Sequence, residues 1–153
     1  MKAPLLRQKG TAIIEFALSF ILIWVLILAV IEFSRLMFSW STAGEASRLA
    51  ARLASICSND SAQQNTIKNR VSWYIQASGQ IDLGNRADWL DIKYLPSGCD
   101  SNSCTMVETA LIDLKPTLMV PGLNSIIRLP NFRTALPREV MLRNFGEVNH
   151  ACD

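Results

Sequence analysis

A nearly uninterrupted apolar run from Ala12 to Ile31 constrains this chain more than any other feature of its sequence. A helix of this length, at about 1.5 Å per residue, spans about 30 Å, the thickness of one hydrocarbon core. The sequence therefore predicts a membrane-spanning helix. The one charge in the run is Glu15, and it needs an explanation because a carboxylate in hydrocarbon costs at least ~2.5 kcal/mol.

The charges outside the run predict its orientation. Lys2, Arg7 and Lys9 precede it, and the positive-inside rule places such an end in the cytoplasm. The chain has 15 basic and 13 acidic residues, so without these three it has 12 basic against 13 acidic. The positive charge thus belongs to the N-terminal segment, and we expect no nucleic-acid partner. Everything after about residue 35 is expected in the periplasm, where disulfides form.

Two ordinary explanations of the N-terminus compete. A cleaved secretory signal would use the small residues Ser41, Thr42 and Ala43 as its cleavage site, but the apolar run is too long for one and carries Glu15. A plain signal anchor fits the length of the run and gives no reason for Glu15.

The residues around Glu15 resemble the class III signal of type IV pilin-like proteins. A short basic leader ends in Gly10, the small residue Thr11 follows, and Glu15 and Phe16 come fifth and sixth after Gly10. More narrowly, this segment resembles the TadE-like minor pseudopilins of tight-adherence pili, as do the strings IEFSR at residues 31–35 and AGEASRLAARLAS at residues 43–55.

The resemblance is close over the first third of the chain and departs from the family at two positions. The family often has proline near the position of Ile21 and glycine at the position of Ser34. We therefore expect no proline kink in this helix. Neither departure touches Gly10, Thr11 or Glu15.

The resemblance implies processing and assembly. A prepilin peptidase would cut between Gly10 and Thr11, and Glu15 would pair with the N-terminal amine of a neighbouring subunit. The implied partners are this peptidase, other minor pseudopilins, major pilin subunits, the inner-membrane assembly platform and membrane lipid. The implied role is initiation, tip formation or assembly of a tight-adherence pilus for adhesion and biofilm. The alternative is a single-pass, signal-anchored periplasmic binding or enzymatic domain unrelated to pili.

Helical spacing continues past the apolar run, which predicts one helix from about residue 12 to 56. Glu32 and Arg35 are spaced i,i+3 and form a candidate interface pair. Aromatic residues suited to an interfacial belt follow at Phe33, Phe38 and Trp40. Beyond them, two adjacent stripes are expected to face a periplasmic domain and a polar face to point outward. One stripe is Ala46, Leu49, Leu53 and Ile56; the small one is Ala43, Ser47, Ala50 and Ala54; the polar face is Glu45, Arg48 and Arg52.

The remaining sequence predicts a second helix and a small antiparallel sheet. Ser61 and Gln64 match a capping box, and Gly79 is a helix stop. Alternating residues predict a hairpin of strands at 89–95 and 105–114, with a third strand at 138–145. Prolines between residues 116 and 137 predict an irregular loop, with a helical turn near 124–128. The predicted fold is α+β and pilin-like, divided into a leader (1–10), a transmembrane and assembly helix (11–35) and a periplasmic domain (36–153).

Four cysteines allow three disulfide pairings. Cys99 and Cys104 flank the hairpin connector and are the natural local pair, which leaves Cys57 for Cys152. Zinc is the competing reading, but the chain has no CxxC spacing and only one histidine, His150.

No motif indicates an enzyme or a cofactor. The sequence has no glycine-rich phosphate loop and no HExxH or GxSxG string, and His150 alone offers little general-base chemistry. Trp73, Tyr74 and Trp89 are expected in the core rather than in a sugar-binding platform.

Overall fold

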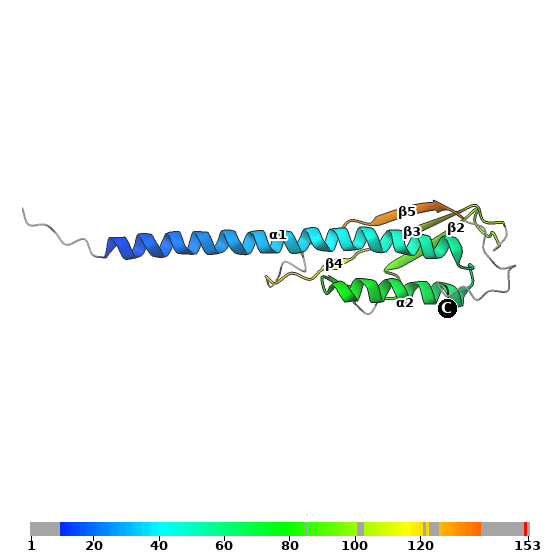
Figure 1. Ribbon diagram of the computed structural model, residues 1–153, viewed down its shortest axis with the longest axis horizontal. Coiled ribbons are helices and arrows are strands. Elements are labelled where there is room, and N and C mark those ends of the chain that lie inside the picture. Colours follow the sequence, from blue (N-terminus) through cyan, green and yellow to red (C-terminus); the bar gives the residue numbers. More distant parts are fainter. Residues whose placement is uncertain are drawn as a thin grey trace, which may run out of the picture. The chain divides into compact units, whose positions relative to one another are not determined.

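The computed structural model describes residues 10–84, 86–100, 103–120, 122, 126–138 and 152. Its first element, α1, is a continuous helix of 46 residues from Thr11 to Ile56 (Figure 1), close to the predicted bounds. The chain divides into two compact units, Met1–Ser34 and Arg35–Asp153. α1 contributes its first half to one unit and its second half to the other.

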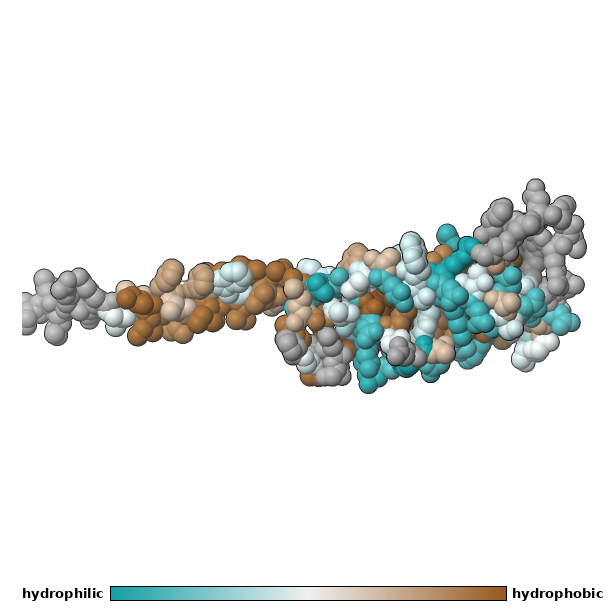
Figure 2. Space-filling view, turned by 90° about the horizontal axis from the view of Figure 1, so that it is seen from below, coloured by the Kyte–Doolittle hydropathy of each residue, from teal (hydrophilic) through white to brown (hydrophobic). Residues whose placement is uncertain are grey.

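The first unit exposes its apolar side chains. Among residues 10–34 every residue is exposed except Glu32, which is half-buried, and the face of this helix seen in Figure 2 is mostly hydrophobic. Water-soluble proteins rarely expose apolar patches of this size. Among the described residues, α1 alone is long and apolar enough to cross a membrane.

The second helix, α2, runs from Ser61 to Ser78 and buries one apolar stripe made of Ile67, Val71 and Ile75. It ends at Gly79 as predicted. Gly79 is left-handed, with φ 63°, and its N–H donates to the carbonyl oxygen of Gln76 at 2.9 Å. Glycine suits this position because it has no Cβ to strain the left-handed conformation.

The predicted capping box at the start of α2 is wrong. The N-cap residue is Asp60, so Ser61 is the first helical residue and cannot cap the helix. The side chain of Gln64 donates instead to the carbonyl oxygen of Asn59 at 3.1 Å. The segment between the two helices is therefore held by a bond that reaches back beyond the N-cap.

A three-stranded antiparallel sheet follows, in the order β2–β3–β5. β2 (Leu90–Leu95) and β3 (Met106–Leu111) form the predicted hairpin. Leu90 lies opposite Leu111, and Tyr94 lies opposite Val107. The residues of β3 that face the core are the alternating set Val107, Thr109 and Leu111. The alternation in the sequence puts these three residues on the same face of the strand.

The third strand lies where an irregular loop was predicted. β5 spans Phe132–Pro137 and pairs antiparallel with β3, whereas residues 139–145 of the predicted strand lie outside the described residues. β5 occupies an edge of the sheet, where a terminal proline is tolerated because its missing N–H need not serve a second neighbour. The prolines around this segment led to the prediction of a loop instead of a strand.

Two short strands join the chain that follows α2 to the chain between β3 and β5. β1 (Ile81–Asp82) pairs antiparallel with β4 (Lys115–Pro116). The remainder of the predicted proline-rich loop follows β4, and its helical turn at 124–128 falls partly outside the described residues.

The second half of α1 packs through the predicted small face. Ala43, Ala50 and Ala54 are fully buried, and α2 and the sheet both lie alongside this half of the helix (Figure 1). Small side chains allow close approach: the hydroxyl oxygens of Ser47 and Thr134 lie 2.7 Å apart, and the Thr109 hydroxyl donates to the Ser47 carbonyl oxygen at 3.3 Å. α1 is thus bonded directly to β3 and β5.

The predicted placement of the aromatic residues is only partly right. Trp89 is buried as expected, with 6% of its surface exposed. Trp73 is 72% exposed, and Tyr74 is exposed as well. Trp73 follows Val71 by two residues, about 200° around the helix, so it lies opposite the buried stripe.

Candidate assembly and processing segment

Gly10 and Thr11 stand at the point where the helix begins. Gly10 is exposed immediately before α1, and Thr11 is its first residue. A Cβ added to Gly10 would meet no atom within 4 Å, and the backbone of Gly10 is not left-handed. The fold of this chain therefore does not require glycine here.

Glu15 is exposed one helical turn after Thr11. The spacing of four residues places both side chains on the same face of α1. No ion pair among the described residues includes Glu15. The other residues from Ala12 to Ile31 carry no charge, so Glu15 is the single electrostatic mark on this surface.

An aromatic row begins beside Glu15. The rings of Phe16 and Phe20 lie 6.1 Å apart, as do those of Phe20 and Trp24. Sequence reasoning named Phe16 and missed the other two, although their spacing of four residues was the available signal. The row gives one side of the membrane segment a distinct, bulky surface.

The two departures from the family pattern are accommodated without a break. α1 continues through Ile21 as regular helix. The Ser34 hydroxyl donates to the carbonyl oxygen of Val30 at 2.8 Å, the local bond by which serine satisfies itself inside an apolar helix.

The predicted pair of Glu32 and Arg35 is not among the ion pairs of the described residues. The Arg35 guanidinium donates instead to the carbonyl oxygen of Thr117 at 3.1 Å. This contact joins residues 82 apart in the sequence, and local spacing gave no sign of it. Within the second unit, Arg35 thus joins the second half of α1 to the chain that follows β4.

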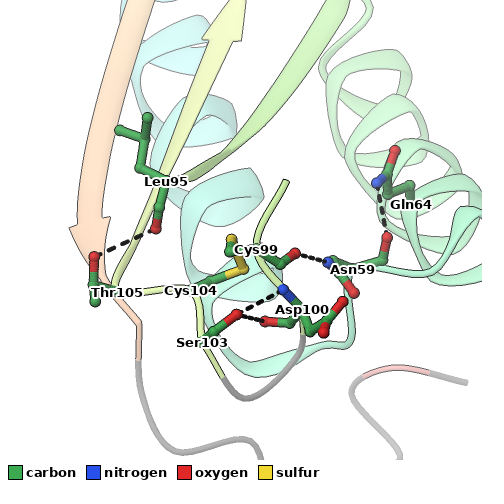
Figure 3. The surroundings of a disulfide bond; sticks show 8 residues. All are labelled: Asn59, Gln64, Leu95, Cys99, Asp100, Ser103, Cys104 and Thr105. Carbon is green, nitrogen blue, oxygen red and sulfur yellow. Dashed lines mark hydrogen bonds between the residues drawn. A yellow bond between two sulfur atoms is a disulfide. The ribbon is translucent and has the colours of Figure 1, made fainter. Parts of the chain in front are cut away.

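Two disulfides close the second unit, with the pairing favoured from the sequence. Cys57 at the end of α1 is bonded to Cys152 across 95 residues, and Cys99 is bonded to Cys104. Asn59 donates to the carbonyl oxygen of Cys99 at 2.9 Å (Figure 3). The small disulfide loop is therefore tied to the connection between α1 and α2.

Two arginine side chains in the second unit form ion pairs with Asp113. Hydrogen bonds from Arg128 and Arg86 hold the pKa of the Asp113 carboxyl below its usual range. The pKa of the Tyr94 phenol shifts in the other direction, because burial raises it. Asp113 has a positive φ of 51°, and its two arginine partners fasten the loop after β3. This is the geometry of a structural clamp.

The described residues offer little for catalysis. None of them form a group of three or more His, Cys, Asp or Glu side chains suited to a metal ion, and His150 lies outside them. A groove of about 490 Å³ between α1 and α2 contains no acidic, histidine or cysteine side chain in its lining. Its lining is Leu49, Leu53, Asn69, Arg70, Trp73 and Tyr74.

No curated protein matches the chain, and no solved structure matches it either. A family model does match, over residues 10–52. The matched segment runs from Gly10 through the apolar helix and into the buried small face of α1. The family is described as TadE-like protein, so the resemblance read from the sequence is confirmed over this N-terminal segment.

Proposed function

We propose that this chain is a minor pseudopilin of a tight-adherence pilus, made as a precursor and held in the inner membrane by α1 with its second unit in the periplasm. The observation that carries the proposal is the order Gly10, Thr11 and Glu15 at the start of an exposed apolar helix, inside the segment that matches the TadE-like family. Its role is structural rather than enzymatic.

Processing falls between Gly10 and Thr11. The fold makes no demand for glycine at position 10, which is what we expect if the source of a glycine requirement is an outside partner. A prepilin peptidase that must approach the backbone closely is such a source, because glycine alone presents no Cβ. The peptide bond lies at an exposed helix start, where a protease meets less regular structure than it would inside α1.

Glu15 then sets the register of assembly. Cleavage would create a new amine at Thr11, and the carboxylate of a neighbouring subunit's Glu15 is the partner of opposite charge. Removing one partner of a buried ion pair costs about 3–5 kcal/mol. Apolar helices that otherwise slide along each other would therefore stop at one axial position.

The second unit fits initiation or a tip better than a repeated shaft. Besides its share of α1 it carries one further helix, two sheets and two disulfides, and a domain of that size limits how densely neighbouring helices pack. We assign the protein to the start or end of the fibre, with other minor pseudopilins, the major pilin and the assembly platform as its partners.

The first experiment tests processing. The full chain is co-expressed with a prepilin peptidase or with its inactive variant, and its N-terminus is sequenced. We expect the chain to begin at Thr11 only with the active enzyme, and Gly10→Val to block the cut. The substituted side chain has open space around it, so α1 should be unaffected. A chain that still begins at Met1 supports a plain anchor, and a start near Gly44 supports ordinary secretion.

The second experiment tests register. Glu15→Gln removes the charge with little change of shape, and we expect membrane insertion to persist while pilus assembly and co-purification with other pilins are lost. Glu45→Gln on the same helix is the matched control, because Glu45 is exposed in the second unit and, within the part of the chain that the structure describes, forms its ion pair with Arg48 on the same helix. Normal assembly of the Glu15→Gln protein would refute the register role.

A further inference from the structure

Three large apolar side chains are exposed in the segment that follows β4. Met119 is 67% exposed, Val120 is 42% exposed and Ile126 is 76% exposed. We call these three residues the apolar rim. The segment is held at both ends, because Leu118 and Leu129 are buried.

Three hydrogen bonds place the start of this segment beside α1. Arg35 donates to the carbonyl oxygen of Thr117 at 3.1 Å, and the Thr117 N–H donates to the carbonyl oxygen of Gln80 at 2.8 Å. The hydroxyl of Ser39 also donates to that Gln80 oxygen, at 3.1 Å. Thr117 is thus fixed beside the first turn that α1 contributes to the second unit.

That turn lies close to the hydrocarbon edge when α1 crosses a bilayer. Arg35 follows Ile31, the end of the apolar run, by four residues, or about 6 Å of helix rise. The headgroup region adds about 5–8 Å on each side of a hydrocarbon core of about 30 Å. The level of Arg35 therefore falls within the headgroup region, and the chain that continues from Thr117 starts there.

Exposed apolar side chains on α1 occupy the same level. Met37 and Phe38 are 43% and 56% exposed, immediately after Arg35. Amphipathic and aromatic side chains concentrate at this depth in membrane proteins. The start of the segment that carries the apolar rim and this turn of α1 thus come from two distant parts of the sequence and meet at the contact between Arg35 and Thr117.

We propose that the apolar rim is a second membrane contact, which inserts into the outer boundary between headgroups and acyl chains while α1 spans the bilayer. The rim would hold the second unit against the membrane surface rather than leave it suspended from a single helix. The inference rests on the membrane anchoring in the proposed function. Transfer of exposed apolar side chains from water into the acyl-chain boundary is favourable, so the three together would favour one orientation of the second unit.

The test uses the full chain reconstituted in vesicles of phosphatidylethanolamine and phosphatidylglycerol that contain a phospholipid with a photoactivatable acyl chain. After illumination, mass spectrometry maps the cross-linked residues. We expect lipid on α1 between Ala12 and Ile31 and also on the rim, but none on Trp73, an equally exposed side chain on α2. Met119→Ser combined with Ile126→Ser should lose the rim cross-links and keep those on α1.

The outcomes separate the two proposals. Lipid on α1 and none on the rim overturns the rim contact alone, and so does a rim signal that persists in the double variant. No lipid on α1 overturns the membrane anchoring and the rim with it. If the wild-type rim takes no lipid, yet the double variant loses co-purified pilins, the surface binds protein and the proposal is wrong. Both substituted residues are exposed, so the second unit should unfold at an unchanged denaturant concentration.

Discussion

The two halves of α1 form one continuous helix, but the first half exposes its apolar side chains and the second half buries one face. From Thr11 to Ser34 bulky apolar side chains point outward, and Glu32 is the one residue that is not exposed. From Arg35 to Ile56 the buried residues are mostly alanine and serine. The first half must find its apolar surroundings outside the chain, whereas the second half has them in α2 and the sheet.

This difference indicates what determines the position of a packing partner on each half of the helix. In the second half, small side chains let α1 approach β3 and β5 closely enough for Ser47 to bond with Thr134, so shape fixes the packing. In the first half, apolar side chains of similar chemistry leave the axial position of a neighbour open. In the proposed assembly, the carboxylate of Glu15 would fix that position.

The largest effect should come from the disulfide that closes the second unit. Replacing Cys57 and Cys152 with serine removes a link across 95 residues, for which chain-entropy models assign about 4–5 kcal/mol. We expect the free energy of unfolding of the second unit to fall by about that amount, measured by denaturant titration of the full chain in detergent micelles. Helical circular dichroism from the membrane half should persist after the second unit unfolds.

The other disulfide is the matched control for this experiment. Cys99 and Cys104 are separated by only five residues, and the same model assigns such a short loop about 2 kcal/mol. Replacing this pair with serine should therefore destabilise the second unit less. Equal losses from the two pairs would contradict the loop-length explanation.

Tryptophan substitutions sharpen the contrast between internal and external burial. Trp89→Ala should lower the free energy of unfolding of the second unit by about 3–5 kcal/mol, the usual cost of emptying a large buried site. Trp24→Ala should leave that unfolding unchanged, because half of the Trp24 surface is exposed on the membrane half. Denaturant titrations of both variants in the same detergent measure the difference. A large loss from Trp24→Ala would show that the first half contributes to the stability of the second unit.

A matched pair of alanines tests close packing within one helix. Ala50 is fully buried and Ala17 is exposed. Leucine has nearly the helix propensity of alanine, so the substitution changes mainly volume. Ala50→Leu should destabilise the second unit by about 1–3 kcal/mol through overpacking, and Ala17→Leu should not affect it. Thermal or denaturant unfolding of the full chain measures both. Equal tolerance would mean that α1 is not tightly packed against the sheet.

The sequence predicted the parts of the fold that repeat with a regular period. The small stripe through Ala43, Ala50 and Ala54 is buried as expected because four-residue spacing keeps one face of a helix together. The hairpin of β2 and β3 was found because alternation marks a strand with one covered face. α1 begins at Thr11, and the cut between Gly10 and Thr11 stays a prediction.

The predictions that were wrong or missing concern features that depend on tertiary structure rather than on a short sequence pattern. β5 was read as loop because prolines surround it, and only its place at a sheet edge makes them harmless. Trp73 was predicted in the core rather than in a sugar-binding platform, although its angle to Val71 points it away. The contact between Arg35 and Thr117 depends on how distant segments meet, which no short spacing encodes.

The smallest effect should be an acid response confined to the second unit. Arg128 and Arg86 lower the pKa of Asp113, so this carboxylate stabilises the fold at pH values above its ordinary unfolded pKa. That contribution is lost as the pH falls below about 3.9 and through the lowered folded pKa. Asp113→Asn keeps a side chain that tolerates the positive φ of 51° and removes the charge. We expect the variant to be slightly less stable at neutral pH and to converge with the wild type in acid, as measured by thermal unfolding across a pH series. The difference should also shrink with added salt, because the cluster is exposed. A stability difference between variant and wild type that stays constant with pH would mean that Asp113 acts through its shape rather than its charge. The second unit would then depend on close packing alone, in sharper contrast to the first half of α1, where Glu15 is the one charge between Ala12 and Ile31.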